Sequence, residues 1–473
     1  MKNTPNSWIR NAWKKSLLAG CWTLLIPCVC AQSDEKKALA VDSKRVGSVA
    51  QSAAQSANTH FLHMLQKGFF RDPKVQAALE SYKGSKYDIA AAWFSSFMPN
   101  VSVSGQIRGS KKNPRPSPID HTRSHTGSLN ISQNIFNSGA SYAQMRKAQL
   151  TTEKSIYDFQ NAQNDYVLRA AGAYMGYITA KRVVAVNQAS VRALLKQYES
   201  VKVRAELGDS TLTDVAQAEV AYVQAQSKLL SAESNFATAI EAYQVIFDEL
   251  PPSVLHKPSL AENLIPSSVK EMQMKSEKEN LELRAQKIQA DSAQYDVTVT
   301  RAALLPRVDA EASIGHAETS YTKLRGRHRA TTTDTAIKVT IPIINNGGTS
   351  YIPSLMKVQH MASSQMNAYQ AKREEVRIKA VQNWKEFMAL RKILAHNQSE
   401  VKAASLSLEG AREEFKVGSR TMLEVLDSEA KYLQAQVQLA QNEQKYMAQF
   451  FMVLAFSGTL DPKNIGLDAA KLS

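Results

Sequence analysis

Cysteine is missing from almost the whole of this chain. Its three cysteines, Cys21, Cys28 and Cys30, all lie within the first 30 of 473 residues. From Ala31 onward no thiol is available to form a disulfide, to bind a metal or to act as a nucleophile. We therefore expect a fold that is held together by packing and hydrogen bonds, without disulfides.

Motifs for metal binding and catalysis are missing as well. His60 and His63 fall on one predicted helical face and His121 and His125 in one predicted loop, but no cysteine or acidic cluster in register completes a metal site. No phosphate-binding glycine loop and no nucleophile beside a base occurs. We expect no metal, no cofactor and no enzymatic activity.

Long apolar runs are limited to one, from Leu17 to Val29, which follows four cations and no acid. It ends in small residues before Ala31, an order typical of a Sec signal peptide. We predict a signal over residues 1–31 and export of the remainder. The alternative is a lipoprotein signal at Leu18-Ala19-Gly20-Cys21, with lipid on Cys21, although the apolar segment ahead of that cysteine is short.

Proline is absent between Ile119 and Leu250 and again between Ser354 and Asp461, and glycine is sparse in both stretches. Such stretches favour long helices. Residues 140–207, as a single helix, would be about 100 Å long, which is longer than a compact domain accommodates. We expect an elongated, mostly helical molecule.

Two predicted helical hairpins turn at Gly208 and Gly418, where a left-handed backbone conformation costs least. After each glycine, apolar residues recur at steps of three and four, the spacing of a coiled-coil seam. The first predicted seam begins at Leu212, and the second includes Leu423 and Ala430.

The two hairpins are copies of each other. Gly208–Glu233 and Gly418–Glu443 align without a gap at an offset of 210 residues and share ten identities in 26 positions. We expect an internally duplicated protomer. Its predicted parts are an N-terminal periplasmic segment, a first structural repeat, a linker, a second structural repeat and a C-terminal tail, over residues 32–71, 72–250, 251–278, 279–460 and 461–473.

Each long helix is preceded by two segments in which apolar and polar residues alternate, at 101–108 and 129–135 and then at 308–314 and 337–343. Alternation predicts strands that are apolar on one side only. An antiparallel sheet that packs on a core fits this pattern, and so does a lipid-facing barrel with a polar interior. Four strands enclose no pore, so a barrel would need further copies of the chain to close its edges.

This order of elements resembles the TolC family of outer-membrane exit ducts over nearly all of residues 72–460. The closest matches are the turns, Gly208-Asp209-Ser210-Thr211-Leu212-Thr213-Asp214-Val215 and Val417-Gly418-Ser419-Arg420-Thr421-Met422-Leu423-Glu424-Val425-Leu426-Asp427. The resemblance implies a homotrimer in the outer membrane of a Gram-negative bacterium. Three protomers would share a 12-stranded β-barrel, continued by a long periplasmic α-helical coiled-coil barrel with a belt where the linker joins the repeats.

The function implied by the resemblance is passive exit, for tripartite drug efflux, type I protein secretion or both. A periplasmic adaptor protein and an inner-membrane pump or ABC transporter would recruit the duct and select its substrate. Adaptor docking would involve the tips, at Gly208, Thr211, Gly418 and Thr421. Two alternatives stay open, a non-conducting periplasmic scaffold and a lipid-anchored metal or drug efflux channel of the same superfamily.

A gate at the tips is also implied by the resemblance. Around a threefold axis, Asp214, Glu424 and Asp427 would form anionic rings that attract cations. Arg420 matches the family's gate arginine, which bridges to the Asp214 position of a neighbouring protomer. Phe415 stands where the family has a tyrosine, and it cannot donate a hydroxyl hydrogen bond to Asp214. For each charge the alternative is a solvated tip residue.

The chain carries a net charge of +15, yet export argues against a nucleic-acid partner. Many cations cluster in the predicted loops between paired strands, where they would face lipopolysaccharide phosphates or only solvent. They are Arg108, Lys111, Lys112, Arg115 and Arg123, with one acid, Asp120, in the first loop, and Lys323, Arg325, Arg327 and Arg329 in the second.

Overall fold

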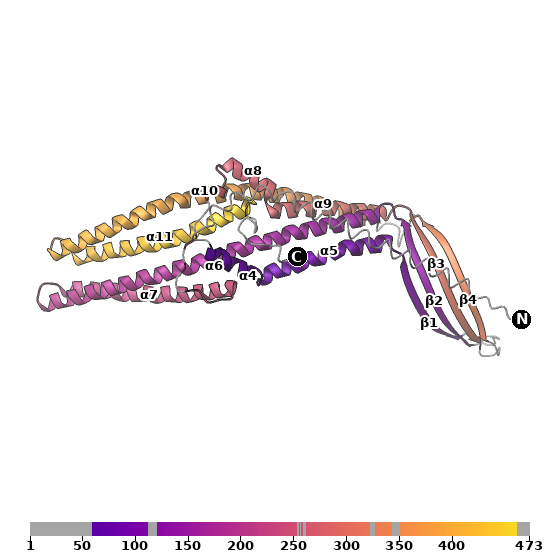
Figure 1. Ribbon diagram of the computed structural model, residues 1–473, viewed down its shortest axis with the longest axis horizontal. Helices are drawn as coiled ribbons and strands as arrows, with labels where there is room; N and C mark the ends of the chain where they lie inside the picture. The colour runs from indigo at the N-terminus through magenta and orange to yellow at the C-terminus, as the bar shows by residue number, and fades with distance from the viewer. Residues whose placement is uncertain are drawn as a thin grey trace.

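The protein is elongated, with helices along most of its length and a sheet at one end (Figure 1). The computed structural model describes residues 59–111, 121–252, 255, 257–258, 262–321, 327–342 and 351–460. The predicted signal peptide, most of the N-terminal segment and the tail after residue 460 lie outside these ranges. Processing after Ala31 or at Cys21 therefore stays a prediction.

Two helices set the length of the molecule, α6 (Ala140–Glu206) and α10 (Tyr351–Lys416). At the usual rise, the 67 residues of α6 span about 100 Å. The end of α6 differs by one residue from the predicted helix over 140–207. Shorter helices lie along these two, α5 (Pro73–Phe97) and α7 (Leu212–Phe247) against α6, and α9 (Leu281–Ala302) and α11 (Met422–Phe456) against α10.

Two further helices lie near the middle of the bundle, α4 (Thr59–Phe69) and α8 (Val269–Glu279) (Figure 1). The 3₁₀ turn η1 (Glu262–Leu264) precedes α8 in the chain. The Trp384 indole N–H donates to the carbonyl of Pro266 at 3.0 Å, which fixes the end of the linker against α10. Among the described residues, no helix is both long and apolar enough to cross a membrane.

The sheet contains four antiparallel strands in the order β1-β2-β3-β4, with bounds β1 (Asn100–Lys111), β2 (His121–Phe136), β3 (Arg307–Tyr321) and β4 (Arg327–Thr340). The predicted starts of the second and fourth strands, at 129 and 337, were wrong. The first halves of β2 and β4 carry almost no apolar residues, so alternation does not reveal them. They are strands because they pair with their neighbours.

Strand register places the apolar residues on one face of the sheet. Val103 lies opposite Leu129, and Val308 lies opposite Val339. The other face is polar, where the hydroxyls of Ser104 and Ser128 lie 2.7 Å apart. Among the described residues nothing covers the apolar face, since Val103 is 82% exposed. Within the described part of the chain, the sheet therefore does not pack on a core, contrary to that alternative.

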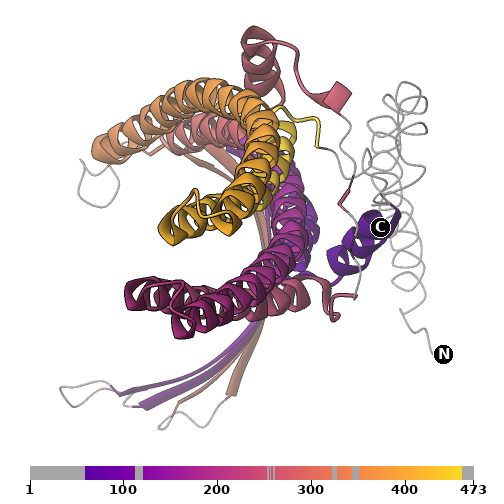
Figure 2. The ribbon, with the colours of Figure 1, turned by 90° about the vertical axis from the view of Figure 1, so that its left-hand side faces the viewer.

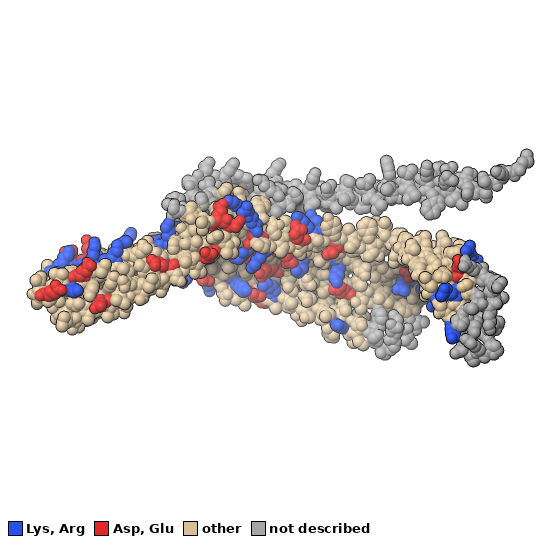
Figure 3. Space-filling view, turned by 90° about the horizontal axis from the view of Figure 1, so that it is seen from below, with Lys and Arg blue, Asp and Glu red and all other residues tan. Residues whose placement is uncertain are grey.

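Charged side chains of both signs are interspersed over the helices on the face seen in Figure 3. At the lateral edges of the sheet, β1 and β4 each pair on one side only within the described chain. Both outer strands therefore retain unpaired backbone N–H and C=O groups along one side.

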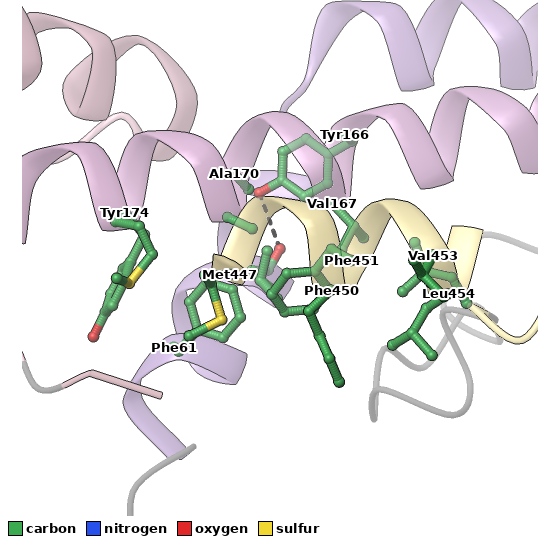
Figure 4. Packing of buried hydrophobic residues seen from close by; sticks show 14 of the residues in the cluster. Phe61, Tyr166, Val167, Ala170, Tyr174, Met447, Phe450, Phe451, Val453 and Leu454 are labelled. Atoms are coloured by element: carbon green, nitrogen blue, oxygen red, sulfur yellow. Dashed lines mark hydrogen bonds between the residues drawn. The ribbon is translucent and has the colours of Figure 1, made fainter. Parts of the chain in front are cut away.

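The main apolar core lies at the middle of the bundle, a region that we call the belt (Figure 4). Phe61 of α4 packs edge-on against Tyr174 of α6 at 4.9 Å between ring centroids. The Tyr166 hydroxyl donates to the carbonyl of Leu65 at 3.1 Å. Burial raises the pKa of Tyr174 to about 12, so this phenol stays protonated and neutral at physiological pH.

A buried carboxylate ties α5 to α6 at the belt. Asp72 caps α5 by accepting from the amides of Lys74 and Val75 at 3.0 and 3.1 Å. It also accepts from Arg169 Nη2 at 2.9 Å, with the Asp72 side chain only 6% exposed. One side chain thus caps the start of a helix and joins that helix to its neighbour.

The hairpin seams form largely as the spacing predicts. Ala218, Ala225 and Ala232 of α7 are buried at intervals of seven residues. Leu212, however, is 85% exposed, because it lies in the first turn of α7 beyond the end of α6.

In α11 the predicted seam register near the tip was wrong. Leu423 is 60% exposed and Ala430 is also exposed, whereas Met422 and Val425 are buried. Helix α11 packs against α6 as well as α10, and Gln197 Nε2 of α6 lies 3.4 Å from the Met422 sulfur. The seam spacing takes only one neighbouring helix into account, so it misses the burial of Met422.

Candidate gate at the helical tips

The glycine turns lie at the end of the molecule opposite the sheet, the end that faces the viewer in Figure 2. Gly208 and Gly418 have φ of +83° and +77°. Each ends its long helix with the paired backbone bonds of a Schellman motif. The Asp209 amide donates to the Arg204 carbonyl at 2.8 Å, and the Ser419 amide donates to the Glu414 carbonyl at 3.0 Å.

At the first tip, Thr211 and Asp214 form a capping box at the start of α7. The Asp214 amide donates to the Thr211 hydroxyl oxygen at 3.1 Å. The Asp214 carboxylate accepts from the Thr211 hydroxyl at 2.7 Å, the Thr211 amide at 3.1 Å and the Ser210 hydroxyl at 3.2 Å. The Thr211 hydroxyl first and the Thr211 amide second hold the pKa of Asp214 below its usual value.

At the second tip, Thr421 caps α11 by accepting from the Glu424 amide at 3.4 Å. The Glu424 carboxylate lies 3.8 Å from Arg420 Nε, which also lies 2.5 Å from a carboxylate oxygen of Glu414. Asp427 pairs with Lys431 at 2.7 Å. Arg420 therefore pairs with two carboxylates of its own hairpin, those of Glu414 and Glu424.

The structure of one protomer does not bring Asp214 and Arg420 together. Their predicted bridge joins neighbouring protomers and stays a prediction. The same holds for the rings of Asp214, Glu424 and Asp427, which require a threefold axis. Within the chain, all three carboxylates lie at the same end of the molecule.

Phe415 contacts a residue that sequence reasoning missed. The guanidinium carbon of Arg204, at the end of α6, lies 5.2 Å from the centre of the Phe415 ring, at the end of α10. The sequence offered one weak signal for Arg204, a cation in the last turn of a helix. The contact connects the first hairpin with the second.

A groove of about 490 Å³ lies between the hairpins behind the tips. It is lined mainly by apolar and small side chains of α6, α7 and α11, among them Leu194, Val220, Ala221, Leu426 and Leu433. Lys228, Asp427 and Glu429 supply charges at its walls. Such a surface can accommodate an apolar helical ridge with a polar margin.

No group of three or more potential metal ligands occurs among the residues that the structure describes. At the far end of the sheet, Lys111 and Arg123 share a face with apolar Ile107, whereas Arg108 lies on the polar face. Arg329 pairs with Glu318 at 3.5 Å. The remaining loop residues of the basic clusters lie outside the described ranges, or their side chains do.

The sequence model of the outer membrane efflux protein family matches residues 70–244 and 274–452, one segment in each half of the chain. The chain belongs to this family. It is therefore a channel protein of the outer membrane with a periplasmic portion, and the expectation that it is not an enzyme is confirmed by the channels to which it is similar.

Three relatives span most of the chain. Outer membrane efflux protein BepC of Brucella suis is 26% identical over 379 residues, which is 80% of each protein. Outer membrane protein TolC of Vibrio cholerae is 23% identical and covers 85% of this chain and 92% of its own length. Alkaline protease secretion protein AprF of Pseudomonas aeruginosa is 22% identical and covers 84% of both. The expected resemblance to the TolC family is confirmed.

Solved structures agree on the fold. The channel CusC superposes with a TM-score of 0.71 at 15% identity, over 84% of this chain and 92% of CusC. The outer membrane protein VceC of Vibrio cholerae superposes with a TM-score of 0.69 at 17% identity, over 84% of this chain and 96% of VceC.

Proposed function

We propose that three copies of this chain form an exit duct through the outer membrane and across the periplasm. The observation that carries the proposal is the sheet, which has one uncovered apolar face, one polar face and two unpaired outer strands. Four strands from each of three protomers would close a 12-stranded barrel, with the apolar face toward lipid and the polar face toward a water-filled bore. The helices would continue that bore as a periplasmic tube.

The cargo is proposed from the relatives. BepC is named an efflux protein and AprF a protease secretion protein, so the duct serves tripartite drug efflux, type I secretion or both. A periplasmic adaptor would dock at the tips, around Gly208, Thr211, Gly418 and Thr421, with a helical ridge in the groove between the hairpins. An inner-membrane pump or ABC transporter would supply the energy and the substrate.

At the far end of the sheet, Lys111 and Arg123 follow directly after the apolar face. In the proposed barrel they would lie at the height of the outer headgroups and attract lipopolysaccharide phosphates. Both Lys111 and Arg123 lie on the apolar face of the sheet, which would face lipid in the proposed barrel.

The gate is proposed at the tips. In the closed trimer, Arg420 would exchange one of its own carboxylates, Glu414 or Glu424, for Asp214 of a neighbouring protomer, and the Asp214, Glu424 and Asp427 rings would select cations. A single exposed ion pair would stabilise the closed state by about 0 to 1 kcal/mol. The contributions of three such pairs would add if all three must break for the tip to open. An adaptor that binds the open form better would offset this sum.

Single-channel conductance in planar bilayers tests the duct and the gate separately. We expect a low conductance for the native trimer and a higher one for Arg420→Ser and for Asp214→Ala, because each removes one side of the bridge. Lys416→Ser is the matched control, since Lys416 is an exposed cation of the same turn that pairs with Glu413 at 2.6 Å.

Absence of any current from the lipid-embedded native protein would favour the non-conducting scaffold over the duct. Unchanged conductance in both Arg420→Ser and Asp214→Ala would remove the gate and leave the duct in place.

A further inference from the structure

The contacts between α6 and the second hairpin continue from the belt to the tips and change in kind along the way. Near the belt, Arg182 Nη1 pairs with Glu443 at 3.0 Å, and the Thr179 hydroxyl donates to the Ala440 carbonyl at 3.4 Å. Further out comes the contact between Gln197 and the Met422 sulfur at 3.4 Å. The outermost contact that the described residues show between α6 and this hairpin joins Arg204 and Phe415.

The backbone carbonyls of both Arg204 and Phe415 accept hydrogen bonds that close the turns after them. The Arg204 carbonyl accepts from the amide of Asp209 at 2.8 Å, one residue after Gly208. The Phe415 carbonyl accepts from the amide of Gly418 at 3.0 Å. The side-chain contact therefore joins the two turns, and the backbone of neither residue can shift without disturbing the turn that it closes.

The contact between the Arg204 guanidinium and the Phe415 ring is attractive but weak enough to be broken when the hairpins separate. A guanidinium over an aromatic face is attracted by the ring quadrupole within about 6 Å of the centroid. Arg204 also lies at the carbonyl end of α6, where a cation is favoured by the helix dipole. Among the described residues, no carboxylate lies within ion-pair distance of Arg204, so the ring of Phe415 is its principal partner there.

We propose that Arg204 and Phe415 clamp the two hairpins of one protomer together in the closed duct. The clamp takes the place of the hydrogen bond that a tyrosine hydroxyl at position 415 would donate. It rests on the proposed gate, but it acts within one protomer, whereas the bridge of Arg420 acts between protomers. When the second hairpin moves away from the first, the guanidinium leaves the ring and the tip widens.

Two measurements on the native trimer test the clamp. We expect Phe415→Leu and Arg204→Gln each to raise the single-channel conductance and to speed amide hydrogen exchange in the tip peptides about two- to fivefold, the range set by an exposed cation–aromatic contact. Phe415→Tyr keeps the ring and adds a hydroxyl donor, so it should raise neither value. Lys202→Gln removes an exposed cation two residues from Arg204 and is the control for charge alone.

The double variant Phe415→Leu with Arg204→Gln should exceed neither single variant, because one contact is lost in all three. Multiplying effects, or unchanged exchange and conductance in both single variants, would overturn the clamp. Should Arg420→Ser open the channel while Phe415→Leu does not, the gate stands and the clamp is wrong. Should the native protein carry no current, hydrogen exchange in the solubilised trimer still decides whether the contact exists.

Discussion

The two tips of the molecule share a backbone and differ in how their side chains are used. Both turns end in a glycine with positive φ and are followed by a threonine cap. At the first tip, Ser210 and Thr211 donate to Asp214, which completes the cap within the turn. At the equivalent places of the second tip stand Arg420 and Glu424, and Arg420 pairs with Glu414 outside the cap. The two copies share the turn, but the first has the Ser210 hydroxyl within its cap where the second has Arg420, which pairs with Glu414 outside it.

The same divergence continues behind the tips. The first hairpin is joined by stacked Tyr198 and Tyr222, with 6.3 Å between ring centroids and 3° between planes. The second is joined by an ion pair between Arg412 and Glu429, whose side chain is 12% exposed. At the place of that pair the first hairpin has exposed Lys202 and Glu219. The two hairpins therefore share a backbone arrangement, but an aromatic pair joins the helices of the first and an ion pair joins those of the second.

The largest difference between the copies is expected when the cation of this ion pair is removed. Arg412→Ala leaves the nearly buried Glu429 carboxylate without its partner. Such a loss costs about 3 to 5 kcal/mol for a fully buried pair, and we expect about 2 kcal/mol here because Arg412 is 44% exposed. Lys202→Ala, its counterpart in the first hairpin, should change stability by less than about 0.5 kcal/mol. Thermal unfolding of the solubilised trimer measures both, and equal shifts would show that the seams do not differ.

A smaller difference is expected from the caps. Asp214→Ala removes the reciprocal half of the capping box and should cost about 1 kcal/mol, whereas Glu424→Ala removes no cap acceptor and should cost less than about 0.5 kcal/mol. Hydrogen exchange in the peptides that contain each turn reports the two costs separately.

The stability lost in Asp214→Ala depends on pH, and the sign of this dependence follows from the pKa of Asp214. The folded pKa of Asp214 lies below its unfolded value, so its contribution is complete above about pH 4 and is lost as the pH falls through the folded pKa. Thermal unfolding of native protein and Asp214→Ala should therefore converge in acid below about pH 4. A gap that persists unchanged in acid would contradict the capping role of the carboxylate.

The smallest difference is expected from the turn glycines. An added Cβ at Gly208 or at Gly418 would meet nothing within 4 Å, so only the positive φ opposes alanine. Gly208→Ala and Gly418→Ala should each cost about 1 to 2 kcal/mol and agree to within about 0.5 kcal/mol. Exchange of the amides that close each turn measures this, and a marked inequality would mean that one turn is held by more than its backbone.

Sequence reasoning located the helices and turns because their signals are local. Missing prolines define α6 and α10, and the glycines define their ends. The early parts of β2 and β4 escaped it, since polar strands are specified by their neighbours and not by their own pattern. The same limit applied to α11, where Met422 is buried against α6, a helix distant in the sequence.

At the candidate gate, the predicted residues lie on the two turns, but their contacts within the protomer were not predicted from the sequence. Asp214 can complete a cap or bridge to a neighbour, and only the geometry shows that one protomer uses it as a cap. The contact between Arg204 and Phe415 joins residues that are far apart in the sequence and follow no motif. Partner choice among long charged side chains depends on tertiary positions that a linear pattern does not contain.

Helix α6 is continuous from the belt to the tip, so a small change in its tilt at the belt produces a larger displacement at the tip. From Tyr174 to the end of the helix at Glu206 the axis runs for about 50 Å, so a tilt of about 5° at the belt displaces the far end by about 4 Å. Such a displacement is comparable to the size of a hydrated side chain. In the proposed duct, substitutions in the aromatic packing around Tyr174 would therefore change the width at the tips from about 50 Å away.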